Sequence, residues 1–149
     1  MSISASKFLR RAALAAPLLF AGGVPASALC VTSPMTGNWM STNPATRGLT
    51  RAEVEVGCCD QVLNGQLVCS PPDSVRLFGR CHPTDCDWGV RAGAFQTGGG
   101  LRLTYNQGFA RRTVRIDPLA GGNLRVRVFT DFADPRRRDY NMTEIMRPE

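Results

Sequence analysis

Apolar and polar residues alternate along most of the chain after residue 30, and this period of two predicts β-strands. In residues 50–56, Ala52, Val54 and Val56 alternate with three charged residues, as in a strand with one buried and one solvated face. No window after residue 30 has a sustained period of 3.6, so the pattern predicts no amphipathic helix. Further strands are predicted at residues 37–40, 60–69 (as a hairpin), 74–80, 88–96, 101–105, 113–116, 124–128 and 140–146.

The same alternation predicts which side chains face the core. Trp39, in the predicted strand at residues 37–40, is expected to plug one end of that core. In the segment 88–96, one side of the strand is expected to carry Trp88, Val90, Ala92 and Ala94. In the later strands, the inward side chains are expected to be Leu101, Leu103, Tyr105, Val114, Ile116, Leu124, Val126 and Val128.

Turn sequences separate these strands at intervals of roughly 8–12 residues. Asn64-Gly65 predicts a two-residue type I′ hairpin turn, and residues 97–100 and 117–123 predict further connections. Because the connections are short, consecutive strands are expected to pair as antiparallel neighbours. Since closure removes exposed sheet edges, we expect an all-β fold, a small antiparallel meander that closes into a β-barrel of about eight strands. A β-sandwich is the alternative.

The first 28 residues have the three parts of a secretory signal peptide. Basic residues precede an apolar run at 12–20, and Ala26-Ser27-Ala28 has the small residues of a cleavage site. The apolar run is too short to cross a bilayer comfortably, so no transmembrane segment is expected. We therefore expect residues 1–28 to be removed and residues 29–149 to form a single disulfide-rich β domain, secreted or periplasmic. Lipidation of Cys30 is an alternative.

Six cysteines in a short exported chain predict three disulfide bonds. Cys81 and Cys86 enclose four residues that include a proline turn, so they are expected to pair with each other. If Asn64-Gly65 is the hairpin turn, Cys58 and Cys69 share a face, which favours Cys58–Cys69 and Cys30–Cys59 bonds. A β-bulge in the hairpin would exchange these partners.

The charge balance argues against a polyanionic partner. The formal net charge is +6, but three of the 18 basic residues lie in the leader, which leaves 15 arginines against 12 acidic residues. The run Arg136-Arg137-Arg138 is typical of a solvated loop. Because a duplex or a membrane surface requires a larger positive field, neither nucleic acid nor membrane is expected as a partner.

The segment Gly79-Arg80-Cys81-His82-Pro83-Thr84-Asp85-Cys86-Asp87-Trp88-Gly89 gathers two cysteines, the only histidine, a proline and a tryptophan into eleven residues. It resembles the signature of a group of small secreted bacterial proteins and domains. The similarity continues through Gly37-Asn38-Trp39, Thr46–Arg51, Tyr105–Ala110 and Asp139–Thr143. The resemblance implies an exported protein, but it implies no particular activity. More weakly, Gly37-x-Trp39 is similar to the entry motif of lipocalin-like and avidin-like barrels.

Side chains that could carry catalysis do not form a complete motif in the sequence. Glu53 and Glu55 are two residues apart on a strand, where they share the solvated face. A hydrolase would use His82 as base with Asp85 or Asp87, but no nucleophile elbow accompanies them. Zinc bound by Cys81, His82 and Cys86 is disfavoured because exported thiols are usually oxidised. We therefore expect no enzyme activity, no metal and no cofactor.

Recognition by loops is the function that this pattern favours. Rigid β scaffolds commonly present binding residues on their loops or in the mouth of a barrel. The leading hypothesis is a secreted, non-enzymatic binding protein whose ligand is a carbohydrate, a protein or a small molecule. An inhibitor of an extracellular protease is the alternative, because a disulfide-held loop is preorganised for docking. A hydrolase is less favoured. The candidate ligand-binding residues are His82, Thr84, Asp85, Asp87, Trp88 and Trp39.

Overall fold

The computed structural model describes residues 32–149, with the backbone alone at Gln61, Leu67, Cys69 and Ser70. The predicted signal peptide and Cys30 lie outside the described residues. The described part of the chain contains strands and no helix, so no helix in it could cross a membrane. The strands are β1 (Gly37–Ser41), β2 (Leu49–Glu55), β3 (Cys58–Leu63), β4 (Gln66–Ser70), β5 (Ser74–Gly79), β6 (Cys86–Ala92), β7 (Ala94–Phe95), β8 (Leu101–Asn106), β9 (Ala110–Pro118), β10 (Leu124–Phe132) and β11 (Tyr140–Pro148).

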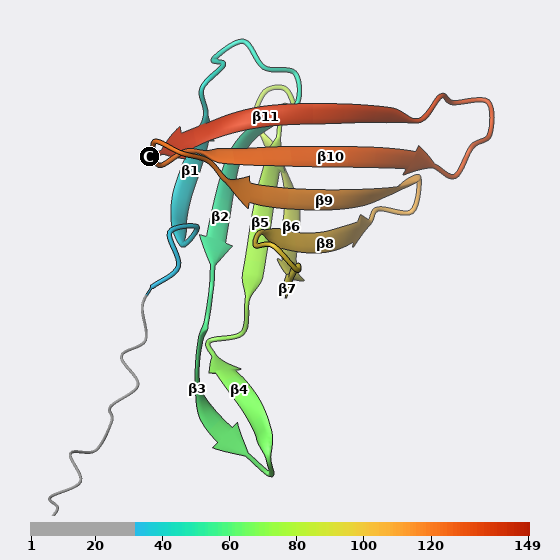
Figure 1. The fold of residues 1–149 in the computed structure, drawn as a ribbon. Coiled ribbons are helices and arrows are strands. Elements are labelled where there is room, and N and C mark those ends of the chain that lie inside the picture. Colours follow the sequence, from blue (N-terminus) through green and yellow to red (C-terminus); the bar gives the residue numbers. More distant parts are fainter. Residues whose placement is uncertain (1–31) are drawn as a thin grey trace, which may run out of the picture.

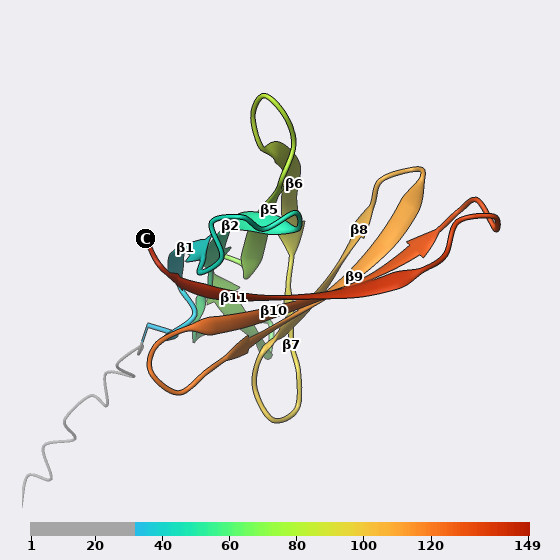
Figure 2. The ribbon, with the colours of Figure 1, turned by 90° about the horizontal axis from the view of Figure 1, so that it is seen from above.

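Nine of these strands form one antiparallel sheet in the order β6-β5-β2-β1-β11-β10-β9-β8-β7. The sheet curls into a nearly closed barrel (Figure 1 and Figure 2). Consecutive strands are neighbours, except that the β3–β4 hairpin lies between β2 and β5 and that β6 and β7 are the two ends of the sheet. β1 pairs with β11, which joins the two halves of the sheet. The predicted all-β barrel, built as an antiparallel meander, is confirmed.

The two ends of the sheet, β6 and β7, belong to one segment that bends at Gly93. β6 pairs with β5, whereas β7 pairs with β8 through Ala94 and Phe95. A Cβ atom on Gly93 would lie 3.3 Å from Leu101 Cδ2, so the bend leaves little space for a side chain. β6 and β8 are not joined by a ladder of hydrogen bonds, and the two strands diverge (Figure 2).

The core fills the barrel with the inward side chains that the alternation predicts. In β8, Leu101, Leu103 and Tyr105 are buried while Arg102 and Thr104 are exposed. The same pattern holds in the neighbouring strands, where every second residue faces the core. The buried cluster from these strands includes Leu49, Ala52, Val54, Val75, Leu77, Val114, Ile116, Leu124, Val126, Val128 and Met146.

The predicted alternation is wrong for β6 after Trp88. The register between β5 and β6 shifts between Arg76 and Phe78, and Gly89 has a φ of +80°. This bulge adds one residue to β6 and so reverses which side chains point inward. Trp88 faces the core, but Val90 is 54% exposed, and Ala92 and Ala94 are also exposed.

The β3–β4 hairpin is a separate two-stranded sheet that projects from the barrel (Figure 1). Asn64 and Gly65 have φ angles of +51° and +78°, as a type I′ turn requires. Leu63 pairs with Gln66 and Gln61 pairs with Val68, which is the predicted register near the turn.

A bulge between Cys58 and Gln61 shifts the register at the base of this hairpin. Cys58 and Cys59 are both disulfide-bonded. Their predicted partners, Cys69 and Cys30, lie outside the side chains that the structure describes. Because a bulge exchanges the partners that the unshifted register favours, both pairings stay open.

Trp39 closes the end of the barrel at which β1 begins and β11 ends. Its side chain is buried, with 4% of its surface exposed, and its indole N–H donates to the carbonyl oxygen of Met35 at 3.0 Å. Met35 is itself buried in the same cluster. The expectation that Trp39 plugs one end of the core is therefore confirmed. The segment between β5 and β6 that is closed by the Cys81–Cys86 bond, which we call the stapled corner, lies at the other end.

Candidate functional site

A pocket of about 680 Å³ opens at the end of the barrel opposite Trp39, and we call it the mouth pocket. Four parts of the chain frame it: the β1–β2 loop, the β5–β6 corner, the β8–β9 turn with the start of β9, and the start of β11. Its lining residues are Arg47, Gly48, Gly79, Arg80, Cys81, Cys86, Asp87, Trp88, Gln107, Phe109, Arg112, Tyr140, Asn141, Met142 and Glu144.

Trp88 forms one wall of the mouth pocket. Its indole meets the ring of Tyr105 edge to face, with centroids 5.6 Å apart and an interplanar angle of 78°. Tyr105 is fully buried, its hydroxyl donates to the carbonyl oxygen of Val75 at 3.0 Å, and burial raises its pKa. Tyr105 therefore holds the Trp88 ring in position. The indole N–H of Trp88 itself has no hydrogen-bond acceptor in the described part of the chain.

Arg112 enters the mouth pocket from β9, on the same face as the buried Val114 and Ile116. Its guanidinium carbon lies 4.1 Å from the centroid of the Trp88 ring and 5.6 Å from that of Phe109. Arg112 Nε is buried and has no hydrogen-bond partner among residues 32–149. Burial lowers the pKa of Arg112 and nearby Arg137 adds to this, whereas Tyr140 opposes it. Because an arginine stays protonated in proteins, the pocket holds a fixed positive charge.

Glu144 occupies the β11 side of the pocket and is held by two hydroxyl groups. Its Oε1 accepts a hydrogen bond from Thr46 Oγ1, and its Oε2 accepts one from Ser41 Oγ at 3.1 Å. A Cβ atom on Gly48 would lie 2.8 Å from Glu144 Oε1 and closer still to the sulfur of Met142. The absence of a side chain at Gly48 therefore lets the β1–β2 loop pack against the start of β11.

The stapled corner forms the rim of the mouth pocket. Cys81 and Cys86 are disulfide-bonded with their Cα atoms 5.4 Å apart, which confirms the predicted pair. The enclosed residues His82, Thr84 and Asp85 are exposed. Because both sulfurs are in the bond, they cannot act as thiolate ligands for zinc. No cluster of three possible metal-ligating side chains occurs within residues 32–149.

Arg80 ties this rim to the β1–β2 loop. Its guanidinium donates to the carbonyl oxygens of Thr46 at 3.2 Å and Pro44 at 3.1 Å, and it lies 3.6 Å from the Asp85 carboxylate. Asp85 is thus paired with Arg80. His82 makes no hydrogen bond with a carboxylate or a serine hydroxyl in the described part of the chain, so the contacts that a Ser-His-Asp hydrolase requires are not formed there.

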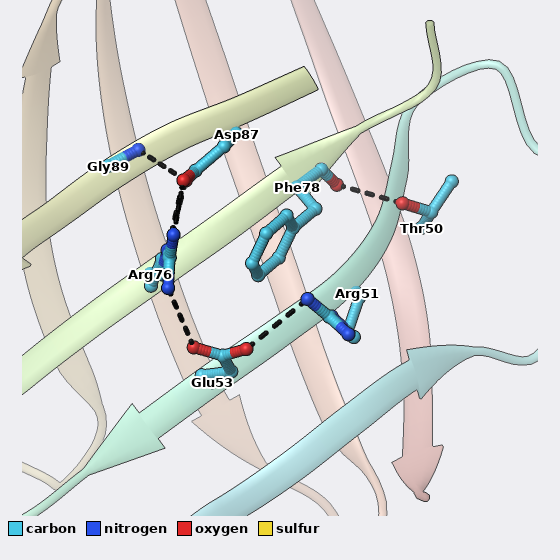
Figure 3. A network of polar contacts seen from close by, with 7 residues as sticks. All are labelled: Thr50, Arg51, Glu53, Arg76, Phe78, Asp87 and Gly89. Atoms are coloured by element: carbon cyan, nitrogen blue, oxygen red, sulfur yellow. Dashed lines mark hydrogen bonds and ion pairs between the residues drawn. The ribbon is translucent and has the colours of Figure 1, made fainter. Parts of the chain in front are cut away.

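Asp87 lines the pocket but points its carboxylate toward a network on the outer face of the sheet (Figure 3). It accepts hydrogen bonds from Arg76 on β5 and from the backbone N–H of Gly89 at 2.8 Å. Arg76 also lies 3.7 Å from Glu53, which continues the network to β2. The hydrogen bonds from Arg76, followed by the one from Gly89, lower the pKa of Asp87 to about 2.

Of the six candidate binding residues, the structure brings five to the mouth end of the barrel. Trp88 and Asp87 line the pocket, and His82, Thr84 and Asp85 lie on its rim. Trp39 lies at the opposite end, so it does not share a pocket with the others.

The sequence analysis missed Arg112, Phe109, Tyr140, Met142 and Glu144. One signal for Arg112 was present, because its position two residues before Val114 places a charge on the apolar face of a strand. Phe109, Tyr140 and Met142 lie in segments on which the resemblance was based, and these segments meet at the mouth.

Comparison with family models, with curated proteins and with solved structures gives no match for this chain.

Proposed function

We propose that this protein is a secreted, non-enzymatic recognition protein that holds its ligand in the mouth pocket. The observation that supports this most is the pocket itself, whose volume of about 680 Å³ suits a small molecule or the end of a glycan. Its walls combine the aromatic rings of Trp88, Phe109 and Tyr140 with a few polar groups. Such a mixture is typical of ligand sites, in which apolar contact supplies affinity and polar groups fix orientation.

The frame around this pocket is preorganised. The Cys81–Cys86 bond, the Arg80 contacts with the β1–β2 loop and the hydroxyl contacts of Glu144 fix three parts of the rim. Trp39 and Met35 fill the other end of the barrel. Because little of the rim must be ordered when a ligand binds, the entropic cost of binding is small.

A ligand screen on the mature, disulfide-intact protein tests the proposal. Neutral sugars, neutral aromatic compounds and anionic compounds are screened by ligand-observed NMR, and hits are measured by calorimetry. Phe109→Ala removes an aromatic wall residue that is 51% exposed, so the fold is expected to survive. We expect this variant to weaken each hit about tenfold, as loss of a ring contact often does.

Phe95→Ala is the matched control, because Phe95 is similarly exposed but lies on β7, away from the mouth pocket. It should leave the affinities unchanged. If the two variants behave alike, or if no compound binds, the mouth pocket is not the recognition site.

A protease inhibitor is a second candidate, because the disulfide-bonded segment exposes the four consecutive residues from His82 to Asp85. Such a loop resembles the fixed, accessible segment that an inhibitor presents to a protease. Inhibition assays against serine, cysteine and metalloproteases test this alternative. Under it, Thr84→Ala should weaken inhibition while Phe109→Ala should not, which separates a rim interaction from ligand binding in the pocket.

A further inference from the structure

Arg112 has no ion pair in the described part of the chain, and it is the one such arginine there that is not exposed. Eight arginines in residues 32–149 form ion pairs with carboxylates, but Arg112 forms none in this part of the chain. It is also partly buried on the core side of its strand. A desolvated cation without a counter-charge is costly unless a partner satisfies it.

The aromatic contacts of Arg112 hold its guanidinium in place through ring faces, and Tyr140 adds a hydrogen bond to the same side chain. Trp88 lies 4.1 Å from the guanidinium carbon, and Phe109 lies 5.6 Å from it. Contacts with ring faces are made by the π-surface, so the N–H groups of the guanidinium that Tyr140 does not use stay available. The buried Nε, which has no partner among the described residues, is one of them. The fork geometry of arginine suits a planar carboxylate.

The two acidic side chains of the pocket do not neutralise Arg112. The Asp87 carboxylate is bound by Arg76 on the outer face, and both oxygens of Glu144 accept hydrogen bonds from Thr46 and Ser41. An anionic group would therefore be attracted to the β9 side of the pocket and repelled from the β11 side. The rings beside Arg112 offer an apolar surface next to this charged position.

We propose that the mouth pocket takes an aromatic carboxylate, with its carboxylate group on the Arg112 guanidinium and its apolar body against Trp88 and Phe109. This inference rests on the proposed function, since it names the ligand class of the same pocket. The Gln107 side-chain oxygen, which is buried and has no partner in residues 32–149, also lines the pocket and accepts a ligand N–H or O–H group. A carboxylate that carries such a donor on its ring satisfies both groups.

The test compares 2-naphthoate with its neutral analogue 2-naphthamide by calorimetry on the mature, disulfide-intact protein. Both probes have the same apolar body, so their difference measures the charge interaction. We expect wild-type protein to bind naphthoate about tenfold more tightly, which is the gain typical of a charge-assisted hydrogen-bonded pair. Arg112→Gln should remove this preference while the affinity for naphthamide changes little.

Arg102→Gln is the matched control, because Arg102 is an exposed arginine on the outer face of β8 without an ion pair in the described residues. It should keep the preference for naphthoate. In case Arg112→Gln fails to fold, the side-chain Nε–Hε resonance of Arg112 is followed in wild-type protein, where naphthoate but not naphthamide should shift it.

The outcomes separate the two proposals. Equal binding of the two probes to wild-type protein, or a preference that survives in Arg112→Gln, overturns the carboxylate inference and leaves the mouth pocket as a binding site. Binding of only neutral or cationic compounds from the screen to the mouth pocket also overturns the carboxylate inference and leaves the pocket as a binding site. If no compound of any class binds there, both proposals fail.

Discussion

The indole ring of Trp88 lies directly over Gly79, so that a Cβ atom on Gly79 would be only 2.7 Å from Trp88 Nε1. Gly79→Ala is therefore expected to displace the tryptophan and to destabilise the protein by about 1–3 kcal/mol, as overpacking typically does. Urea denaturation of the two proteins measures this difference.

A double-mutant cycle with Trp88→Ala shows whether the contact is the cause. Once the indole is removed, the extra methyl group of Gly79→Ala should cost much less than it does in wild-type protein. A Ser74→Ala variant at the start of the same strand is the control and should change stability by less than about 0.5 kcal/mol. Equal costs of Gly79→Ala in both backgrounds would show that the indole contact is not responsible.

The buried hydroxyl of Tyr105 supports the wall of the mouth pocket. It donates to the carbonyl oxygen of Val75 at 3.0 Å, and the side chain is fully buried. Tyr105→Phe should lower the free energy of unfolding by about 1 kcal/mol, because one buried hydrogen bond is lost while the ring remains. Tyr140→Phe is the control, since Tyr140 is 43% exposed, and it should have a smaller effect. Thermal denaturation distinguishes the two variants.

Asp87 is expected to make stability depend on pH in the acidic range. Its pKa falls from 3.8 to about 2, chiefly through the hydrogen bonds from Arg76. Because the pKa is lower in the folded state, the stabilising contribution is complete above pH 3.8 and is lost as the pH falls toward 2. The stability difference between wild-type protein and Asp87→Asn should therefore be constant near neutral pH and shrink between these two values.

Arg76→Gln is the companion variant for this prediction, because it removes the guanidinium that lowers the Asp87 pKa. The pH-dependent part of the stability should be reduced in Arg76→Gln as it is in Asp87→Asn. Denaturant titrations across the acidic range give the comparison, and a difference that does not change with pH would contradict the assignment.

Asp117 forms ion pairs with three arginines on the outer face of the barrel and so offsets part of their positive charge. Its oxygens lie 2.8 Å from Arg115 Nε, 2.8 Å from a terminal nitrogen of Arg127 and 3.8 Å from one of Arg125. Arg115 and Arg127 face each other in the β9–β10 register, where like charges repel. Asp117→Asn should therefore destabilise the protein by about 1–3 kcal/mol.

The salt dependence of stability distinguishes charge repulsion between these arginines from a simple loss of hydrogen bonds. At about 1 M salt the repulsion between the arginines is screened, so part of the lost stability should return in Asp117→Asn. Asp134→Asn, which removes an exposed pair with Arg136, is the control and should cost less than about 0.5 kcal/mol. An equal loss at low and high salt would exclude charge repulsion as the cause.

Much of the fold could be predicted because, in a strand with one buried face, every second residue is apolar. The alternation of Leu101, Leu103 and Tyr105 identified both the strand and its inner face. Short turns such as Asn64-Gly65 indicated the antiparallel connections. The inner face of β6 was predicted wrongly because a single-residue bulge at Trp88 and Gly89 leaves no mark in a pattern of period two.

The mouth pocket was harder to predict because its residues are far apart in the sequence. The stapled corner was recognisable as a unit, which is why Trp88 and Asp87 were among the candidates. Arg112 meets Trp88 only because the sheet curls until its end strand β6 comes back beside β8 and β9. That meeting depends on closure of the barrel, which local patterns do not encode.

The bend at Gly93 has a consequence for the entry of ligands. Since β6 and β8 are not paired with each other, Trp88 of β6 and Tyr105 of β8 join these strands by a side-chain contact. A bulky guest that enters between these strands therefore breaks no main-chain hydrogen bond between β6 and β8, and only side-chain contacts resist it.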